Sequence, residues 1–197
     1  MSAFYVNPLL GFGIMVGGIA LGALTADARL ALVALVAQYA GAAAVMAAGS
    51  ASAIAWLHLA VGGLAAAILY LGIRARSADR PDRAATAGLP FRAVALLMAL
   101  AAGGVLAVRW PLPHAGGLTS LACFALAAGF VAQVGVFQQP ARIGMATLTL
   151  LTAASMYTHV AGGSLLLVAL VLCGHLFTAL AASRSQATPS AGQEEPR

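Results

Sequence analysis

The side chains of this sequence that can do chemistry within apolar surroundings are a few histidines and amides. His58, His159 and His175 each lie inside a long apolar stretch. Imidazoles on facing membrane helices can hold haem iron. At about 1.5 Å per residue, His58 and His159 lie at similar depths near one end, whereas His175 lies about 9 Å deeper than His58. The spacing therefore leaves open a haem or quinone site between His58 and His159.

A second set of polar side chains can line a hydrated path. Five residues of the stretch 141–161 fall within about a third of the circumference of one helix, and they are Thr149, Thr152, Ser155, Met156 and His159. Ser and Thr in membrane helices also bond their own i−4 carbonyl or a neighbouring helix, so packing remains an alternative. The candidate path residues are Gln38, Gln133, Thr149, Thr152, Ser155 and His159.

Other chemistry is excluded or disfavoured by what the sequence lacks. It contains no lysine, which excludes a Schiff base and a phosphate-loop lysine, and no hydrolase, zinc-protease or nucleotide motif occurs. None of the five acids falls in the middle of an apolar stretch, which argues against a self-sufficient ion pump. Cys123 and Cys173 read as small core residues. We expect no catalytic residue, no metal site and no cofactor.

The elements that position these side chains are membrane helices. Of the 197 residues, 62% are hydrophobic and 8% are charged, against about 25% charged in soluble domains. A spanning helix needs about 20 apolar residues, and no strict alternation of a β-barrel occurs. The predicted fold is an all-α polytopic membrane protein of about seven spans, at roughly 6–25, 29–49, 52–73, 91–109, 116–138, 141–161 and 163–183.

The arginines predict the orientation. With seven spans, nine of the ten arginines fall on one side and only Arg109 on the other. Positive loops stay in the cytoplasm, so we expect the N-terminus outside and the C-terminus inside. The alanine-rich composition, with arginine as the only basic residue besides histidine, indicates a GC-rich bacterial genome and hence a bacterial cytoplasmic membrane. The net charge of +5 does not indicate nucleic acid, because the arginines sit at the ends of apolar runs.

One domain, 1–184, is expected, followed by a disordered cytoplasmic tail at 185–197. It divides into a three-helix unit at 1–73, a cytoplasmic loop at 74–90, a connecting helix at 91–115 and a second three-helix unit at 116–184. The turn sequences Ala28-Arg29 and Ala141-Arg142, which are 113 residues apart, favour a duplication. Chance similarity between Ala-rich helices is the alternative.

A Gly-rich helix, an arginine in a tight cytoplasmic turn and a long second helix resemble the small K-type subunit of respiratory complex I. The C-type subunit of multisubunit cation/proton antiporters and the E component of hydrogenase-4-type complexes are similar. The better match is 117–182, with Gln139-Pro140-Ala141-Arg142, and the weaker is 27–72, with Ala37-Gln38-Tyr39. Together they cover about 60% of the chain. The resemblance carries over only Arg29 and Arg142, as cytoplasmic turn residues.

The resemblance implies an accessory subunit of an ion-translocating complex, without catalysis of its own, whose partners are other integral membrane subunits and the lipid bilayer. One departure bears on this role. The K-type subunits carry a membrane-embedded glutamate on the second helix, whereas Tyr39, Thr152 or Ser155 stands near that place here. A stand-alone transporter and a haem- or quinone-binding protein remain the alternatives.

Overall fold

Seven helices make up the described part of the chain, which comprises residues 7–48, 52–76 and 88–187 of a computed structural model. The prediction of an all-helical chain with about seven long helices is confirmed, since the described residues contain no strand. The helices are α1 (Pro8–Leu24), α2 (Ala28–Ala47), α3 (Ser52–Arg76), α4 (Leu89–Arg109), α5 (Gly117–Val136), α6 (Pro140–Val160) and α7 (Leu165–Ala187).

Local sequence explains where several helices begin and end. The side chains of Asn7 and Asp27 accept hydrogen bonds from the backbone N–H groups of Leu9 and Arg29, at 3.0 and 2.8 Å, and so cap α1 and α2. Prolines occupy the first turns of α1, α4 and α6, where a missing N–H costs nothing. After α6, Gly162 takes a φ of 67°, a conformation that glycine adopts without strain.

The boundaries predicted for the loop and for the tail differ from those of the structure. The helix α3 continues to Arg76, into the predicted 74–90 loop, and α4 begins at Leu89, so that only 77–87 of the loop lies outside the described residues. The helix α7 continues to Ala187, beyond the predicted start of the tail at 185. The rest of the tail, 188–197, lies outside the described residues.

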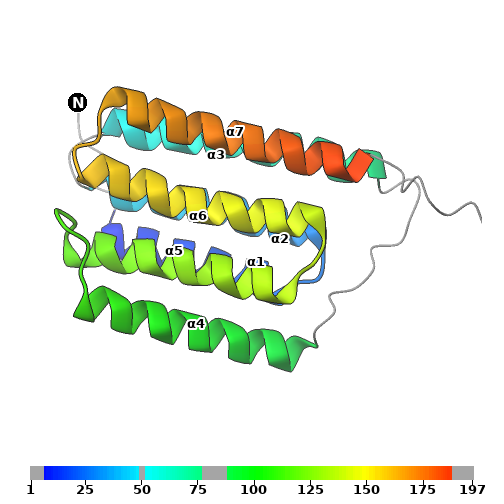
Figure 1. The fold of residues 1–197 in the computed structure, drawn as a ribbon, viewed down its shortest axis with the longest axis horizontal. Coiled ribbons are helices and arrows are strands. Elements are labelled where there is room, and N and C mark those ends of the chain that lie inside the picture. Colours follow the sequence, from blue (N-terminus) through cyan, green and yellow to red (C-terminus); the bar gives the residue numbers. More distant parts are fainter. Residues whose placement is uncertain (1–6, 49–51, 77–87, 188–197) are drawn as a thin grey trace, which may run out of the picture.

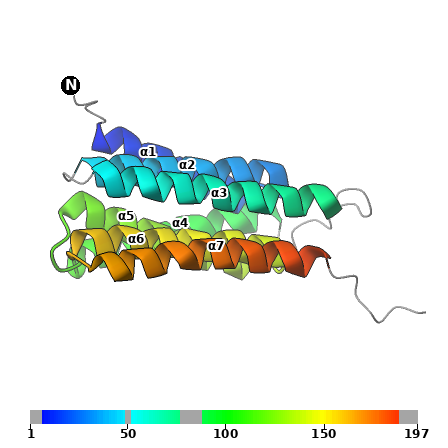
Figure 2. The same ribbon diagram turned by 90° about the horizontal axis from the view of Figure 1, so that it is seen from above.

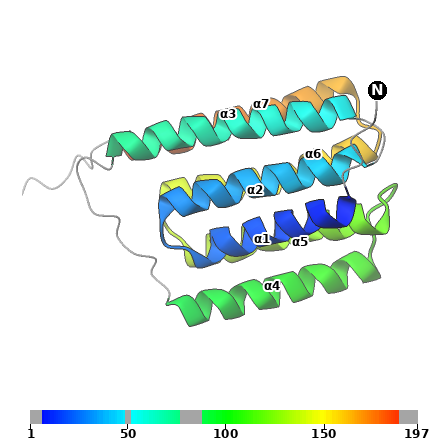
Figure 3. The same cartoon turned by 180° about the vertical axis from the view of Figure 1, so that it is seen from behind.

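The helices form two layers (Figure 2). One contains α1, α2 and α3, and the other contains α5, α6 and α7 with α4 beside α5. Across the gap, α1 contacts α5, α2 contacts α6, and α3 contacts α7. Each such pair runs in the same direction (Figure 1). The helix α4 lies at the edge, against α5 and α1 (Figure 3).

The outward faces are apolar, as in a helical membrane protein. Five helices (α2, α3, α4, α5 and α7) are long and apolar enough to cross a membrane. The helix α1 is shorter, with 17 residues, and α6 carries four threonines and one serine. Large apolar side chains such as Met98, Val108, Leu166 and Phe177 are exposed on α4 and α7. Surfaces of this kind suit lipid or neighbouring membrane helices.

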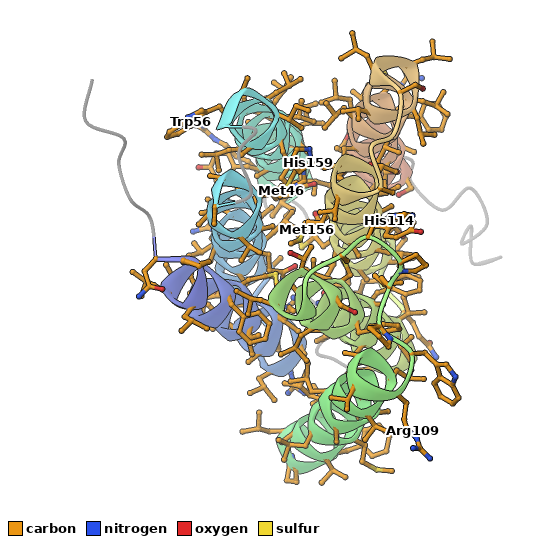
Figure 4. The ribbon with its side chains drawn as sticks, turned by 90° about the vertical axis from the view of Figure 1, so that its left-hand side faces the viewer. Met46, Trp56, Arg109, His114, Met156 and His159 are labelled. Carbon is orange, nitrogen blue, oxygen red and sulfur yellow. The ribbon has the colours of Figure 1, made fainter. Side chains whose placement is uncertain are left out.

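The two ends of the bundle differ in charge. The starts of α2, α4 and α6 and the ends of α3 and α7 meet at one end, the right-hand end of Figure 1. These termini carry Arg29, Arg92, Arg142, Arg74 and Arg184, and we call this the arginine end. Arg109, at the end of α4, lies at the opposite end, with His114 (Figure 4). The predicted orientation depends on this separation of the arginines between the two ends of the bundle.

Candidate functional site

Two arginines at the arginine end satisfy the carbonyl groups that end α1. The last carbonyls of a helix lack intrahelical partners, and α1 has no basic residue in its last turn. Arg142 is buried and donates to the carbonyl oxygens of Gly22 and Thr25, at 3.3 and 2.7 Å. Arg92 donates to the carbonyl oxygen of Leu24 at 2.7 Å. The negative end of the α1 dipole is therefore neutralised by side chains of α4 and α6.

Phe137 completes this arrangement. Its ring is buried, and the guanidinium carbon atoms of Arg142 and Arg92 lie 4.5 and 5.9 Å from its centroid. Both distances permit a cation–π interaction. Arg29, the counterpart of Arg142 in the predicted repeat, is exposed. The two turn arginines carried over from the resemblance thus have different environments, because only Arg142 enters the protein.

Next along the interior lie two amides and a hydroxyl, which we call the amide cluster and define as Gln38, Gln133 and Thr149. All three are buried. A Cβ atom on Gly22 would lie 3.5 Å from Nε2 of Gln38 and 3.6 Å from Nε2 of Gln133. Side chains from α2 and α5 therefore converge on the same glycine of α1.

The hydrogen bonds of the α6 threonines fit both interpretations of the polar stripe. The Thr149 hydroxyl lies 2.8 Å from Oε1 of Gln38 and 3.1 Å from the carbonyl oxygen of Met145. Thr152 donates to the carbonyl oxygen of Leu148 at 2.9 Å, the i−4 bond of helix packing. Ser155 is buried and its hydroxyl makes no hydrogen bond in the described structure. Thr149 thus joins two helices, whereas Thr152 bonds its own.

A third group, the ring cluster, consists of Tyr39 on α2, His58 on α3 and His175 on α7. The centroids lie 5.0 Å apart for Tyr39 and His58, and 5.7 Å apart for each of the other two pairs. All three side chains are almost wholly buried. The Tyr39 hydroxyl is buried near Thr152 of α6 and has no hydrogen-bond partner among the described residues. Four helices therefore meet at this cluster, which spans both layers.

The two imidazoles of the ring cluster differ in their hydrogen bonding. His175 Nδ1 lies 2.8 Å from the carbonyl oxygen of Val171, one turn earlier, and so carries the proton and donates it. Its Nε2 and both ring nitrogens of His58 are buried without a hydrogen-bond partner among the described residues. Buried polar atoms usually have partners, so these nitrogens need an explanation.

The remaining candidates lie towards the end opposite the arginines. His159 is half-buried near the end of α6. Figure 4, which looks onto this end, places His159, Met46 and Met156 in the gap between the two layers. Both methionines are buried and belong to the same apolar cluster. Sulfur and imidazole groups therefore lie between the ring cluster and this end of the bundle.

The depth argument for pairing histidines was wrong. It separated His58 from His175, but their rings lie 5.7 Å apart. Because α7 begins at Leu165, His175 lies only about 15 Å along its helix, against about 9 Å for His58 in α3. The side chains of His58 and His175 span the remaining difference in height between their backbones. A porphyrin between them would have to displace Tyr39, which contacts both rings, so this packing does not favour haem.

The sequence did not identify Arg92 as a site residue, and it did not single out Tyr39 as a member of a buried cluster. Arg92 lies four residues into α4, and nothing in its neighbours marks it as a partner of a helix 68 residues earlier. For Tyr39 a signal existed, because it is the only phenol in its apolar stretch.

Comparisons of the chain with protein-family models, with curated proteins and with solved structures find no match.

Proposed function

We propose that this chain is an accessory subunit of an ion-translocating membrane complex, which lines or braces an ion path and catalyses no reaction. The observation that carries the proposal is where the polar side chains lie. The amide cluster, the ring cluster and the α6 hydroxyls are all buried between the two layers, whereas the outward faces of α3, α4 and α7 are apolar. The polar groups of these clusters thus lie in the interior of the bundle.

The paired layers support a duplicated origin for this scaffold. Helices of like rank in each three-helix unit face each other and run in parallel, as two copies of one unit related by a pseudo-twofold axis along the membrane normal would. The helix α4 then runs back along the bundle, so that the second unit begins at the same end as the first.

The charge distribution supports an accessory role rather than that of an independent ion carrier. Transport of protons or cations within a membrane normally uses a buried carboxylate or lysine. The sequence has no lysine, and Asp27, the only acid among the described residues, caps α2 at the arginine end. Neutral amides and hydroxyls can bind water molecules along an ion path. They can also orient an ionisable side chain that a partner subunit supplies.

The large apolar faces support partner binding. The helix α4 packs on one side only and leaves Phe91, Val94, Leu97, Met98 and Val105 exposed. A helix with one bound side and one free side suits the border between this chain and a neighbouring subunit. Lipid can cover the same face, so the test has to separate partners from lipid.

Purification of the tagged full chain from its own membranes in mild detergent, with mass spectrometry of the co-eluting proteins, tests this proposal. We expect larger integral membrane subunits in a fixed ratio to the chain. Elution as a lone monomer or homodimer would reject the accessory role, and the stand-alone transporter, with the amide cluster as its polar contact, would take its place.

A further inference from the structure

We propose that His58 and His175 form a binding site for a soft monovalent metal ion, Cu(I), between α3 and α7. This inference does not depend on the function proposed above. It starts from both ring nitrogens of His58 and Nε2 of His175, which are buried on two facing helices and have no hydrogen-bond partner among the described residues. A metal ion is a partner that such nitrogens accept.

The separation of the two rings fits a shared ion. With metal–nitrogen bonds near 2.0 Å, two imidazoles on opposite sides of one ion have ring centres about 6 Å apart. The centroids of His58 and His175 are 5.7 Å apart, and the ring planes are nearly perpendicular, at 86°. The His58 ring, which makes no hydrogen bond among the described residues, has to turn about its side-chain bonds to aim a nitrogen at an ion held by Nε2 of His175.

The hydrogen bonding of His175 prepares it as a ligand. Metal-binding histidines usually donate their second ring N–H to a carboxylate, a backbone carbonyl or water, which fixes the tautomer and the ring orientation. The bond from His175 Nδ1 to the Val171 carbonyl oxygen does this. The lone pair of Nε2 is then left for an ion. Neutral imidazole, the form that burial in an apolar environment favours, is also the form that binds metals.

The charge and number of the available ligands select Cu(I) over a divalent ion. Among the described residues, no group of three or more His, Cys, Asp or Glu side chains gathers, so the site offers two imidazoles and the neighbouring phenol of Tyr39. Zinc in proteins takes four ligands. A divalent ion would also bring a second charge into an interior without a carboxylate, at a large cost. Cu(I) carries one charge and accepts few ligands.

Soft donors lie between this site and the end of the bundle opposite the arginines. The buried thioethers of Met46 and Met156 and the half-buried imidazole of His159 lie in the gap between the layers at that end (Figure 4). Thioether ligands favour Cu(I), and imidazole binds copper among other transition metals.

The test is anaerobic titration of the purified full-length protein with Cu(I) in the presence of a chromogenic competitor. We expect one tightly bound ion per chain, and an X-ray absorption spectrum dominated by nitrogen donors. His58→Phe and His175→Phe keep a ring in the cluster but remove its nitrogens, and each should weaken binding at least about 100-fold, more than the loss of a second-shell partner. His114→Phe, in the exposed α4–α5 connection, is the matched control and should bind like the parent.

Thermal unfolding and size-exclusion profiles of each variant, without metal, separate lost binding from lost folding. If one phenylalanine variant does not fold, the other variant and the absorption spectrum of the parent protein still decide. The proposal fails if the parent protein binds no Cu(I), if the folded phenylalanine variants bind it as tightly as the parent, or if Zn²⁺ binds the parent more tightly than Cu(I).

Discussion

Tyr39 is held in the ring cluster by a glycine on the facing helix. The backbone of Gly62 in α3 lies directly against the Tyr39 ring, and a Cβ atom at this position would overlap ring carbon atoms. The neighbouring Gly63 has open space where its Cβ would be. Two adjacent glycines of similar appearance in the sequence therefore have opposite roles, and only the three-dimensional packing separates them.

Gly62→Ala should destabilise the protein by about 1–3 kcal/mol, because the added methyl group overpacks a fully buried ring. Gly63→Ala, the matched control, should leave the free energy of unfolding unchanged or raise it slightly, since alanine favours the helix. Thermal unfolding in lipid nanodiscs, followed by intrinsic fluorescence, measures both. Equal melting temperatures for the two variants would contradict the packing of Tyr39 on Gly62.

The hydrogen bond from Thr149 to Gln38 joins the layers within the amide cluster. Thr149→Val keeps the shape of the side chain but leaves Oε1 of Gln38 buried without this donor, at a cost of about 1–3 kcal/mol. Thr147→Val is the control, because the Thr147 hydroxyl bonds only the Ile143 carbonyl oxygen in an exposed position. Denaturation of both variants in the same detergent gives the comparison. A Thr149→Val variant as stable as the control would show that this bond contributes nothing.

At the scale of single helices, α1 depends on other elements for its C-terminal end. Its last turn has no basic residue, and the arginines that satisfy its carbonyls come from α4 and α6, much later in the chain. The sequence predicted the helix itself, because its apolar length is a local signal. It did not predict the arginine contacts, because they depend on which helices lie side by side.

Arg142→Ala should free the carbonyl oxygens of Gly22 and Thr25 and destabilise the protein by about 1.5–3 kcal/mol, the range for hydrogen bonds to charged groups. Arg142→Lys should rescue little, because an ammonium group cannot reproduce the planar guanidinium that reaches both carbonyls and stacks on Phe137. Hydrogen exchange at the end of α1 gives a local readout. Arg29→Ala, at an exposed position, is the control, and an equal increase in exchange for both alanine variants would contradict this role.

For the whole molecule, local patterns were sufficient for the seven helices but not for their depths relative to one another. The end of α4, both ends of α6 and the start of α7 lie within two residues of the predicted span bounds, because the prolines and glycines there act on the backbone where they stand. The meeting of His58 and His175 was missed, because their heights depend on helix starts and on the pairing of α3 with α7. The direction in the membrane still rests on the arginine count alone.

Single-cysteine labelling tests that orientation. In a variant whose native cysteines are replaced, His114→Cys should react with an impermeant maleimide in intact cells, because His114 is exposed at the end opposite the arginines. Asp27→Cys, exposed at the arginine end, should react only after the cells are opened. The reverse pattern would overturn the orientation with the N-terminus outside.

Ion flux into sealed vesicles tests most directly whether this chain serves a larger assembly rather than acting alone. Vesicles containing only the purified chain should show no proton or sodium flux above that of empty vesicles, because the buried residues of the described part of the chain include no carboxylate and no lysine. Vesicles containing the co-purified assembly should show flux, and Gln38→Leu should reduce it. Flux through the chain alone, abolished by Gln38→Leu, would contradict the accessory role and establish an independent transporter.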